Sequence, residues 1–172
     1  LDLFDNYNLI SKYTMNIDRI RNLPMANEEL KERYIAEIKT IRAWLSYLLY
    51  THYGTFPIVP LEILKNPLEE HILPRATEQE MDMFIEQDLK DAIAVLPEKY
   101  DDSDWGRFTK GAAMTILMKF YMQRSRWKEA ENIGREIMEM GYQLMDNYAD
   151  VFSKEHEKNG EIIYSNPCTP DF

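Results

Sequence analysis

Apolar residues recur along this chain at spacings of three and four, which is the period of a helix with one buried face. The pattern predicts five helices: over residues 5–22, over 28–53, from Thr77 to a stop at Pro97, from Thr109 onward, and over 127–140. No segment alternates strongly enough for a strand, and residues 162–164 are the best short extended candidate. We therefore expect an all-α fold, a bundle of helical hairpins with long loops.

Capping residues indicate where several of these helices begin and end. Asn27 is a good N-cap for the helix over 28–53, and Gly54 follows that helix as a C-terminal glycine. Thr77 and Glu80 form a capping box at the start of the next helix. Within 28–53 the ladder that we expect to be buried is Tyr34, Ile38, Ile41, Leu45, Leu48 and His52, widened by Trp44 and Leu49.

The last two predicted helices resemble a tetratricopeptide unit. Such a unit has an aromatic residue, a small turn residue, a second aromatic residue and a close-contact alanine, which are here Tyr121, Ser125, Trp127 and Ala130. We accordingly expect Trp127 to face inward and Met81, Met118 and Met138 to fill gaps in the core. Units of this kind are binding scaffolds far more often than active sites.

The connection over residues 55–76 is long for a compact domain, in which loops beyond about 12–15 residues are usually functional or disordered. It contains four prolines and the apolar residues Phe56, Ile58, Val59 and Leu61. These apolar residues predict that the loop packs along the helices.

Composition limits the classes of partner. The net charge of −10, with no run of basic residues, disfavours nucleic acid, which needs a concentrated Lys/Arg surface. No segment approaches the roughly 20 apolar residues that cross a bilayer. Cys168 is alone, so no disulfide within the chain and no cysteine metal site are expected. The chain begins without Met and ends abruptly at Asp171-Phe172, so the lack of a signal peptide does not show where in the cell the protein works.

Catalytic chemistry has no support in the sequence, and no cofactor or metal is expected. His52, His71 and His156 lack the spacing of a metal motif, and neither a nucleophile elbow nor a phosphate-binding glycine loop occurs. The acidic run over 101–106 fails the calcium-loop template, because Trp105 falls on a ligand position and Ala112 stands where glutamate is needed. A solvated acidic turn is the better interpretation.

Four groups of residues occur in an order that resembles one known family. The first is Tyr34-Ile35-Ala36-Glu37 with Arg42-Ala43 and the loop over 53–59. The second is Arg75-Ala76-Thr77 with Phe84-Ile85, Asp88-Leu89, Ala92-Ile93 and Leu96-Pro97. The third is the run over 106–113, with Phe108 where a small residue is commoner, and the fourth is 148–152 with 159–163. Together these groups resemble the SusD/RagB family over nearly the whole chain.

The resemblance implies a non-catalytic, glycan-binding lipoprotein on the cell surface of Bacteroidetes, in the outer membrane, that works in nutrient uptake with a TonB-dependent (SusC-like) transporter. It implies one SusD-like helical domain over 1–172, with tetratricopeptide-like pairs as its scaffold. Family members are considerably longer, so we expect this chain to be part of a longer protein. The resemblance also implies that membrane attachment is only through a lipid anchor outside these residues.

Two groups of residues are candidates for the glycan site. A sugar ring presents an apolar C–H face to an aromatic platform and a rim of hydroxyls to polar groups. The loop before Thr109 meets that requirement with Tyr100, Asp102, Asp104, Trp105 and Arg107. The alternative, which the position of this loop within the scaffold pattern of the resemblance favours, is that Trp105 is a buried loop anchor. The second candidate is the N-terminal group Phe4, Asn6, Tyr7 and Asn8, whose aromatic residues can also belong to the core.

Two other classes of function stay open at this stage. One is a tetratricopeptide adaptor that binds a peptide in its concave groove, and the other is a structural subunit of the transporter. The sequence alone identifies neither the glycan nor the oligomeric state, and it does not show whether this piece folds alone.

Overall fold

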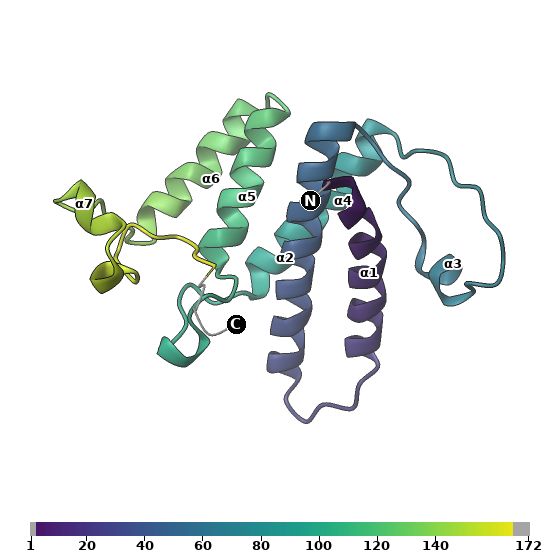
Figure 1. Ribbon diagram of the computed structural model, residues 1–172, viewed down its shortest axis with the longest axis horizontal. Coiled ribbons are helices and arrows are strands. Elements are labelled where there is room, and N and C mark those ends of the chain that lie inside the picture. The colour runs from purple at the N-terminus through teal and green to yellow at the C-terminus, as the bar shows by residue number, and fades with distance from the viewer. Residues whose placement is uncertain (1–2, 167–172) are drawn as a thin grey trace. The chain divides into compact units, whose positions relative to one another are not determined.

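In the computed structural model, which describes residues 3–166, the chain is helical and no strand occurs within those residues (Figure 1). This confirms the all-α prediction. The chain divides into two compact units, residues 1–95 and 96–172, which are described separately. Unit 1 contains a short 3-10 turn, η1 (Leu3–Asn6), and the helices α1 (Tyr7–Arg21), α2 (Glu28–Tyr53), α3 (Leu61–Lys65) and α4 (Glu78–Val95). Unit 2 contains η2 (Asp102–Asp104), α5 (Lys110–Gln123), α6 (Trp127–Glu139), α7 (Tyr148–Val151) and η3 (Lys154–His156).

Helix α2 is the centre of unit 1, because both α1 and α4 pack against it. Small residues on α2 allow its neighbours to come close: Ala36, Thr40, Ala43 and Ser46 are almost completely buried. The facing side of α4 is buried at Met81, Ile85, Leu89 and Ala92, and Met81 was predicted to lie in the core.

The prediction of which α2 residues are buried was wrong except at Leu49, which is 1% exposed. The ladder from Tyr34 to Leu48 is only half-buried, and His52 is exposed, with its Nδ1 2.8 Å from the carbonyl oxygen of Leu48. The reason is that α2 has two partners, so its buried surface includes small and polar residues that a search for large apolar side chains leaves out.

A buried ion pair joins all three long helices of unit 1. Arg42 on α2 donates from Nε and Nη2 to the two carboxylate oxygens of Asp88 on α4, at 2.7 and 2.8 Å. Its Nη1 donates to Thr14 Oγ1 on α1 at 2.8 Å, and its guanidinium lies over the ring of Phe84. Arg42 and Asp88 are 8% and 4% exposed, so each charge depends on the other for solvation.

The predicted caps are present. The side chain of Asn27 accepts from the Leu30 N–H at 2.9 Å. Glu80 accepts from the Thr77 N–H at 2.7 Å while Thr77 Oγ1 accepts from the Glu80 N–H at 3.2 Å, which completes the capping box. The hydrogen bonds that the Thr77 N–H and the Thr77 hydroxyl donate to the Glu80 carboxylate lower its pKa. Gly54 has a φ of +75° after the end of α2, a conformation that favours glycine.

The first half of the long loop over 55–76, up to the short helix α3, packs against the helices of unit 1. Phe56 is buried, the Tyr7 hydroxyl donates to the Pro57 carbonyl at 2.7 Å, and Lys65 pairs with Asp18 at 2.8 Å. Its middle is open: Leu68 and Ile72 are 99% and 94% exposed. The prediction that the apolar loop residues lie on the helices therefore holds near Phe56 and not beyond the short helix α3.

Unit 2 is built on the hairpin of α5 and α6. The turn between them places Ser125 at a φ of +56°, and the Arg126 N–H donates to the Tyr121 carbonyl at 2.9 Å. Ala130 is buried as predicted, but Trp127 is 62% exposed and Met138 is 78% exposed, so the expectation that both pack inward was wrong. Both side chains lie on the outer side of α6, whose inner side is narrow. The hairpin buries Ala113, Ile116, Leu117, Phe120 and Tyr121 of α5.

Across residues 3–166, none of the helices combines the length and the apolar character that crossing a membrane requires.

Candidate functional site

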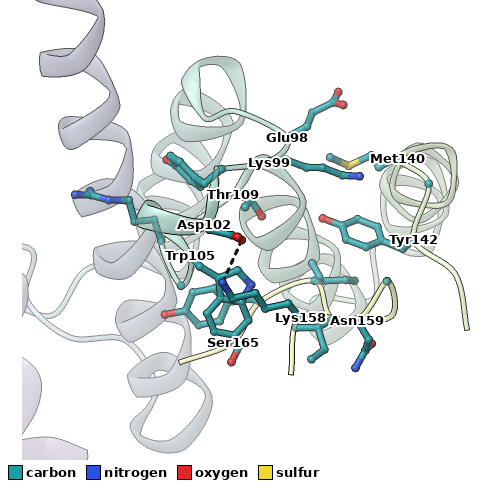
Figure 2. Close-up of a pocket in the computed structure, with 18 residues that line it drawn as sticks. Glu98, Lys99, Asp102, Trp105, Thr109, Met140, Tyr142, Lys158, Asn159 and Ser165 are labelled. Carbon is teal, nitrogen blue, oxygen red and sulfur yellow. Dashed lines mark hydrogen bonds and ion pairs between the residues drawn. The ribbon is translucent and has the colours of Figure 1, made fainter. Parts of the chain in front are cut away.

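Unit 2 contains a cavity of about 310 Å³ next to the loop that the sequence nominated. Three segments form its walls: the loop over 98–109 before α5, the turn over 140–142 after α6, and the chain over 158–165 (Figure 2). Its lining combines aromatic rings, hydroxyls and side chains of both charges.

The loop over 98–109 is held at its ends and within its turn. Thr109 caps α5 by accepting from the Ala112 N–H at 3.2 Å, and the Lys110 N–H donates to the Pro97 carbonyl at 2.8 Å. Inside the loop, Arg107 Nε donates to Asp104 Oδ1 at 2.7 Å, across the turn formed by Gly106 at a φ of +94°. The loop is therefore positioned by the N-terminus of a long helix.

Tyr142 lines the cavity from the turn after α6. Burial raises the pKa of its hydroxyl, a hydrogen bond with Thr109 lowers that pKa, and the negative charge of Glu98 raises it, so that the net direction is upward. A Cβ atom at Gly111 would lie 2.2 Å from the Tyr142 hydroxyl oxygen. Glycine at this position of α5 thus leaves the space that the phenol occupies.

The chain over 158–165 is attached by backbone and side-chain hydrogen bonds. The Gln143 N–H donates to the Gly160 carbonyl at 3.1 Å, and the Met145 N–H donates to Glu161 Oε2 at 3.1 Å. The ring of Tyr164 stacks face to face on Phe108, with centroids 4.7 Å apart and an angle of 2° between the planes. No strand forms over residues 162–164, where the chain bends at Ile163, and the short extended candidate lines the cavity instead.

Trp105 lies half-buried at the lower end of the cavity, under a lysine. Lys158 Nζ is 5.6 Å from the centre of the indole and 3.1 Å from Asp102 Oδ1 (Figure 2). Asp102 is 93% exposed at its side chain, so this ion pair is worth at most about 1 kcal/mol. The indole is therefore neither a bare platform nor a fully buried anchor: it borders the cavity and carries an easily displaced cation.

The structure brings four of the five nominated residues together. Tyr100, Asp102, Trp105 and Arg107 line the cavity. Asp104 does not line it and instead holds Arg107.

The second nominated group lies in unit 1 and does not line this cavity. The side chain of Phe4 lies outside the described residues. Asn6 precedes α1 without a side-chain cap bond, and Asn8 is exposed. Tyr7 packs edge to face on Phe56, with centroids 5.4 Å apart, and donates to Pro57 as described above. These contacts agree with the interpretation of Tyr7 as a packing residue.

Sequence reasoning missed the residues that close the cavity from the other side, namely Lys158, Asn159 and Tyr142. Lys158 pairs with a residue 56 positions earlier, and no local pattern indicates such a contact. The only signal was indirect: the run over 159–163 was recognised as part of the family resemblance, but not as part of a site.

No group of three or more metal-ligating side chains comes together within residues 3–166. Cys168, expected to be a lone thiol, lies outside the described residues.

Comparison with known sequences identifies the family. Residues 4–122 match the SusD-like family described as starch-binding and associating with the outer membrane. Because the match covers well over half of the chain, the protein belongs to the SusD-like family. Proteins of this family bind carbohydrate and are not enzymes.

Individual relatives agree with this assignment. A SusD-like protein of Formosa agariphila is 31% identical over 163 residues, which are 94% of this chain and 30% of that protein. A SusD-like crystal structure from Bacteroides fragilis superposes with a TM-score of 0.86 at 26% identity, covering 99% of this chain and 34% of the other. A laminarin-binding SusD-like protein superposes with a TM-score of 0.82 at 29% identity, covering 93% and 36%. The chain thus spans about a third of the length of these relatives.

Proposed function

We propose that this chain is part of a non-catalytic glycan-binding protein and that the cavity beside Trp105 holds part of the glycan. The observation that carries the proposal is an indole lining a cavity of about 310 Å³, in a chain that belongs to a starch-binding family. That volume is at the lower end of the range of about 300–1,000 Å³ typical of ligand pockets. It suits one or two sugar rings, such as the end of an oligosaccharide.

Binding would use the indole face and the hydroxyls around it. The C–H face of a pyranose ring stacks on Trp105, and Lys158 moves aside, which costs little because its pair with Asp102 is exposed. Once released, the Asp102 carboxylate can accept from a sugar hydroxyl. The laminarin-binding relative supports glycan as the ligand class, although it does not identify the glycan of this chain.

The setting that we propose is the bacterial cell surface. The family associates with the outer membrane. A lipid anchor outside these 172 residues would hold the protein there as a surface lipoprotein, and a TonB-dependent, SusC-like transporter would accept the glycan for nutrient uptake.

Calorimetry with a panel of neutral and acidic oligosaccharides tests the proposed site. We expect saturable binding to at least one member, and we expect Trp105→Ala to weaken it by at least about fivefold, since loss of one aromatic stacking partner costs on the order of 1–3 kcal/mol. Trp127→Ala is the matched control, because Trp127 is exposed on the same unit and does not line the cavity. Binding that survives Trp105→Ala would place the site elsewhere.

The transporter partnership needs a separate experiment. Affinity purification of the membrane-anchored protein from its own cells is expected to recover a TonB-dependent transporter. Recovery of the transporter by a protein that binds no oligosaccharide of the panel would favour a structural subunit instead.

A further inference from the structure

The charged groups of the cavity indicate which class of sugar it takes. We propose that the cavity selects acidic sugars, in which a carboxylate or sulfate is bound by Lys99 and Lys158. This inference rests on the proposed function, because it assigns a ligand class to the same cavity.

Few side-chain acceptors in the cavity are free to bind a sugar. The hydroxyls of a neutral sugar both donate and accept hydrogen bonds, and the side-chain acceptors that serve their donors best are carboxylate and amide oxygens. The amide of Asn159 is already used: its Oδ1 accepts from the Glu161 N–H at 2.9 Å, and its Nδ2 donates to the His156 carbonyl at 2.8 Å. Asp102 is paired with Lys158, so it becomes an acceptor only once that lysine moves to another partner. The Glu98 carboxylate is directed away from Trp105 and Tyr142 (Figure 2).

The cavity offers a ligand more side-chain donors than acceptors. Lys99 lines the cavity, extends toward Met140 (Figure 2), and forms no ion pair with a carboxylate of residues 3–166. Lys158 has one partner and keeps two N–H groups for another. Arg107 adds little, because it is held by Asp104. The cavity therefore offers ammonium donors on two sides and few free carboxylate or amide acceptors.

A cavity with available ammonium donors and few free acceptors favours a ligand that brings its own negatively charged acceptors. Displacing Lys158 from the indole costs least when the ligand supplies a new partner for it, and an acidic group on a ring stacked against Trp105 lies within reach of that lysine. A hydrogen bond between an ammonium and a carboxylate is roughly twice as strong as one between neutral groups. The chain as a whole has a net charge of −10, so this selectivity has to arise locally, in the cavity.

Matched pairs of trisaccharides test the proposal by calorimetry on the full-length protein. One pair is trigalacturonic acid and its methyl ester, and the other is a trimer of β-1,4-linked glucuronic acid and cellotriose. We expect the acid of at least one pair to bind about tenfold more tightly than its neutral counterpart, as charge-assisted hydrogen bonds imply, with the difference shrinking as salt is added. Lys99→Met and Lys158→Met should each reduce that difference, whereas Lys154→Met, an exposed lysine that does not line the cavity, should leave it unchanged.

Neutral sugars that bind as tightly as the acids, in a manner that depends on Trp105, would overturn the acidic class and leave the proposed function standing. An acid preference unchanged by both lysine substitutions would also overturn it. If no trisaccharide binds, the acidic class is rejected, and the wider panel with Trp105→Ala decides the proposed function by itself.

Discussion

The hydroxyl of Tyr142 occupies the space in which a side chain at Gly111 would lie. A Cβ atom at residue 111 would be 2.2 Å from the phenolic oxygen and 3.0 Å from the ring carbon that carries it. The contact joins the first turn of α5 to the turn after α6, which borders the Trp105 cavity. Glycine at 111 is therefore needed for packing, although a helix interior normally disfavours glycine.

Gly111→Ala should destabilise the protein despite the better helix propensity of alanine. Overpacking typically costs about 1–3 kcal/mol, which exceeds the gain of up to about 1 kcal/mol from propensity. Gly134→Ala in α6 is the matched control, because its Cβ would meet only the flexible Met118 sulfur at 3.3 Å. Urea unfolding should give a lower midpoint for Gly111→Ala and a midpoint at or above that of the parent for Gly134→Ala. Equal midpoints for the two variants would show that Tyr142 moves without cost.

Breaking the buried pair between Arg42 and Asp88 should be among the most damaging single changes in unit 1. Asp88→Ala leaves the Arg42 guanidinium buried without its partner, which costs about 3–5 kcal/mol. The double variant Arg42→Met/Asp88→Leu should recover a large part of that loss, since it leaves no unpaired charge. Urea unfolding of the two variants and the parent measures both effects.

Glu131→Ala removes an exposed partner of Arg135 and serves as the control for this series. It should change the free energy of unfolding by less than about 1 kcal/mol. A loss as small for Asp88→Ala would mean that water reaches Arg42 and that the pair is not needed for folding.

Alkaline pH should destabilise the fold partly through Tyr142. Burial and the charge of Glu98 raise the pKa of this phenol in the folded protein, so the folded state holds the proton more tightly than the unfolded state does. The corresponding stability is fully present below the unfolded pKa of about 10 and is lost as the pH rises through the folded pKa. Tyr142→Phe cannot ionise, so its free energy of unfolding should fall less steeply above pH 10. The same steepness in parent and variant would contradict this role.

Helix positions and caps were readable from the sequence because they depend on neighbours three or four residues away. The bounds of α2 and the capping box at Thr77 are of this kind. Which face of α2 is buried was not readable, because it depends on two other helices that approach over Ala36, Ala43 and Ser46. The same limit explains Trp127, which the tetratricopeptide pattern placed inside and the structure leaves exposed.

The candidate site was half predictable for a similar reason. Tyr100, Asp102, Trp105 and Arg107 lie within eight residues, so composition alone drew attention to their loop. Lys158 and Tyr142 reach the cavity from distant parts of the chain, through contacts such as the pair with Asp102 and the fit against Gly111. Those contacts close the cavity around the aromatic loop. No local pattern in the sequence indicates them, because they join residues that are far apart along the chain.

The most direct test of the glycan site follows the three indole N–H signals of Trp44, Trp105 and Trp127 in an NMR titration with an oligosaccharide that calorimetry has shown to bind. Substitution of each tryptophan in turn assigns the signals. We expect the Trp105 signal to shift progressively and to saturate at the oligosaccharide concentration at which calorimetry shows saturation, while the Trp127 signal stays in place. Saturable binding that leaves the Trp105 signal unmoved would contradict the account.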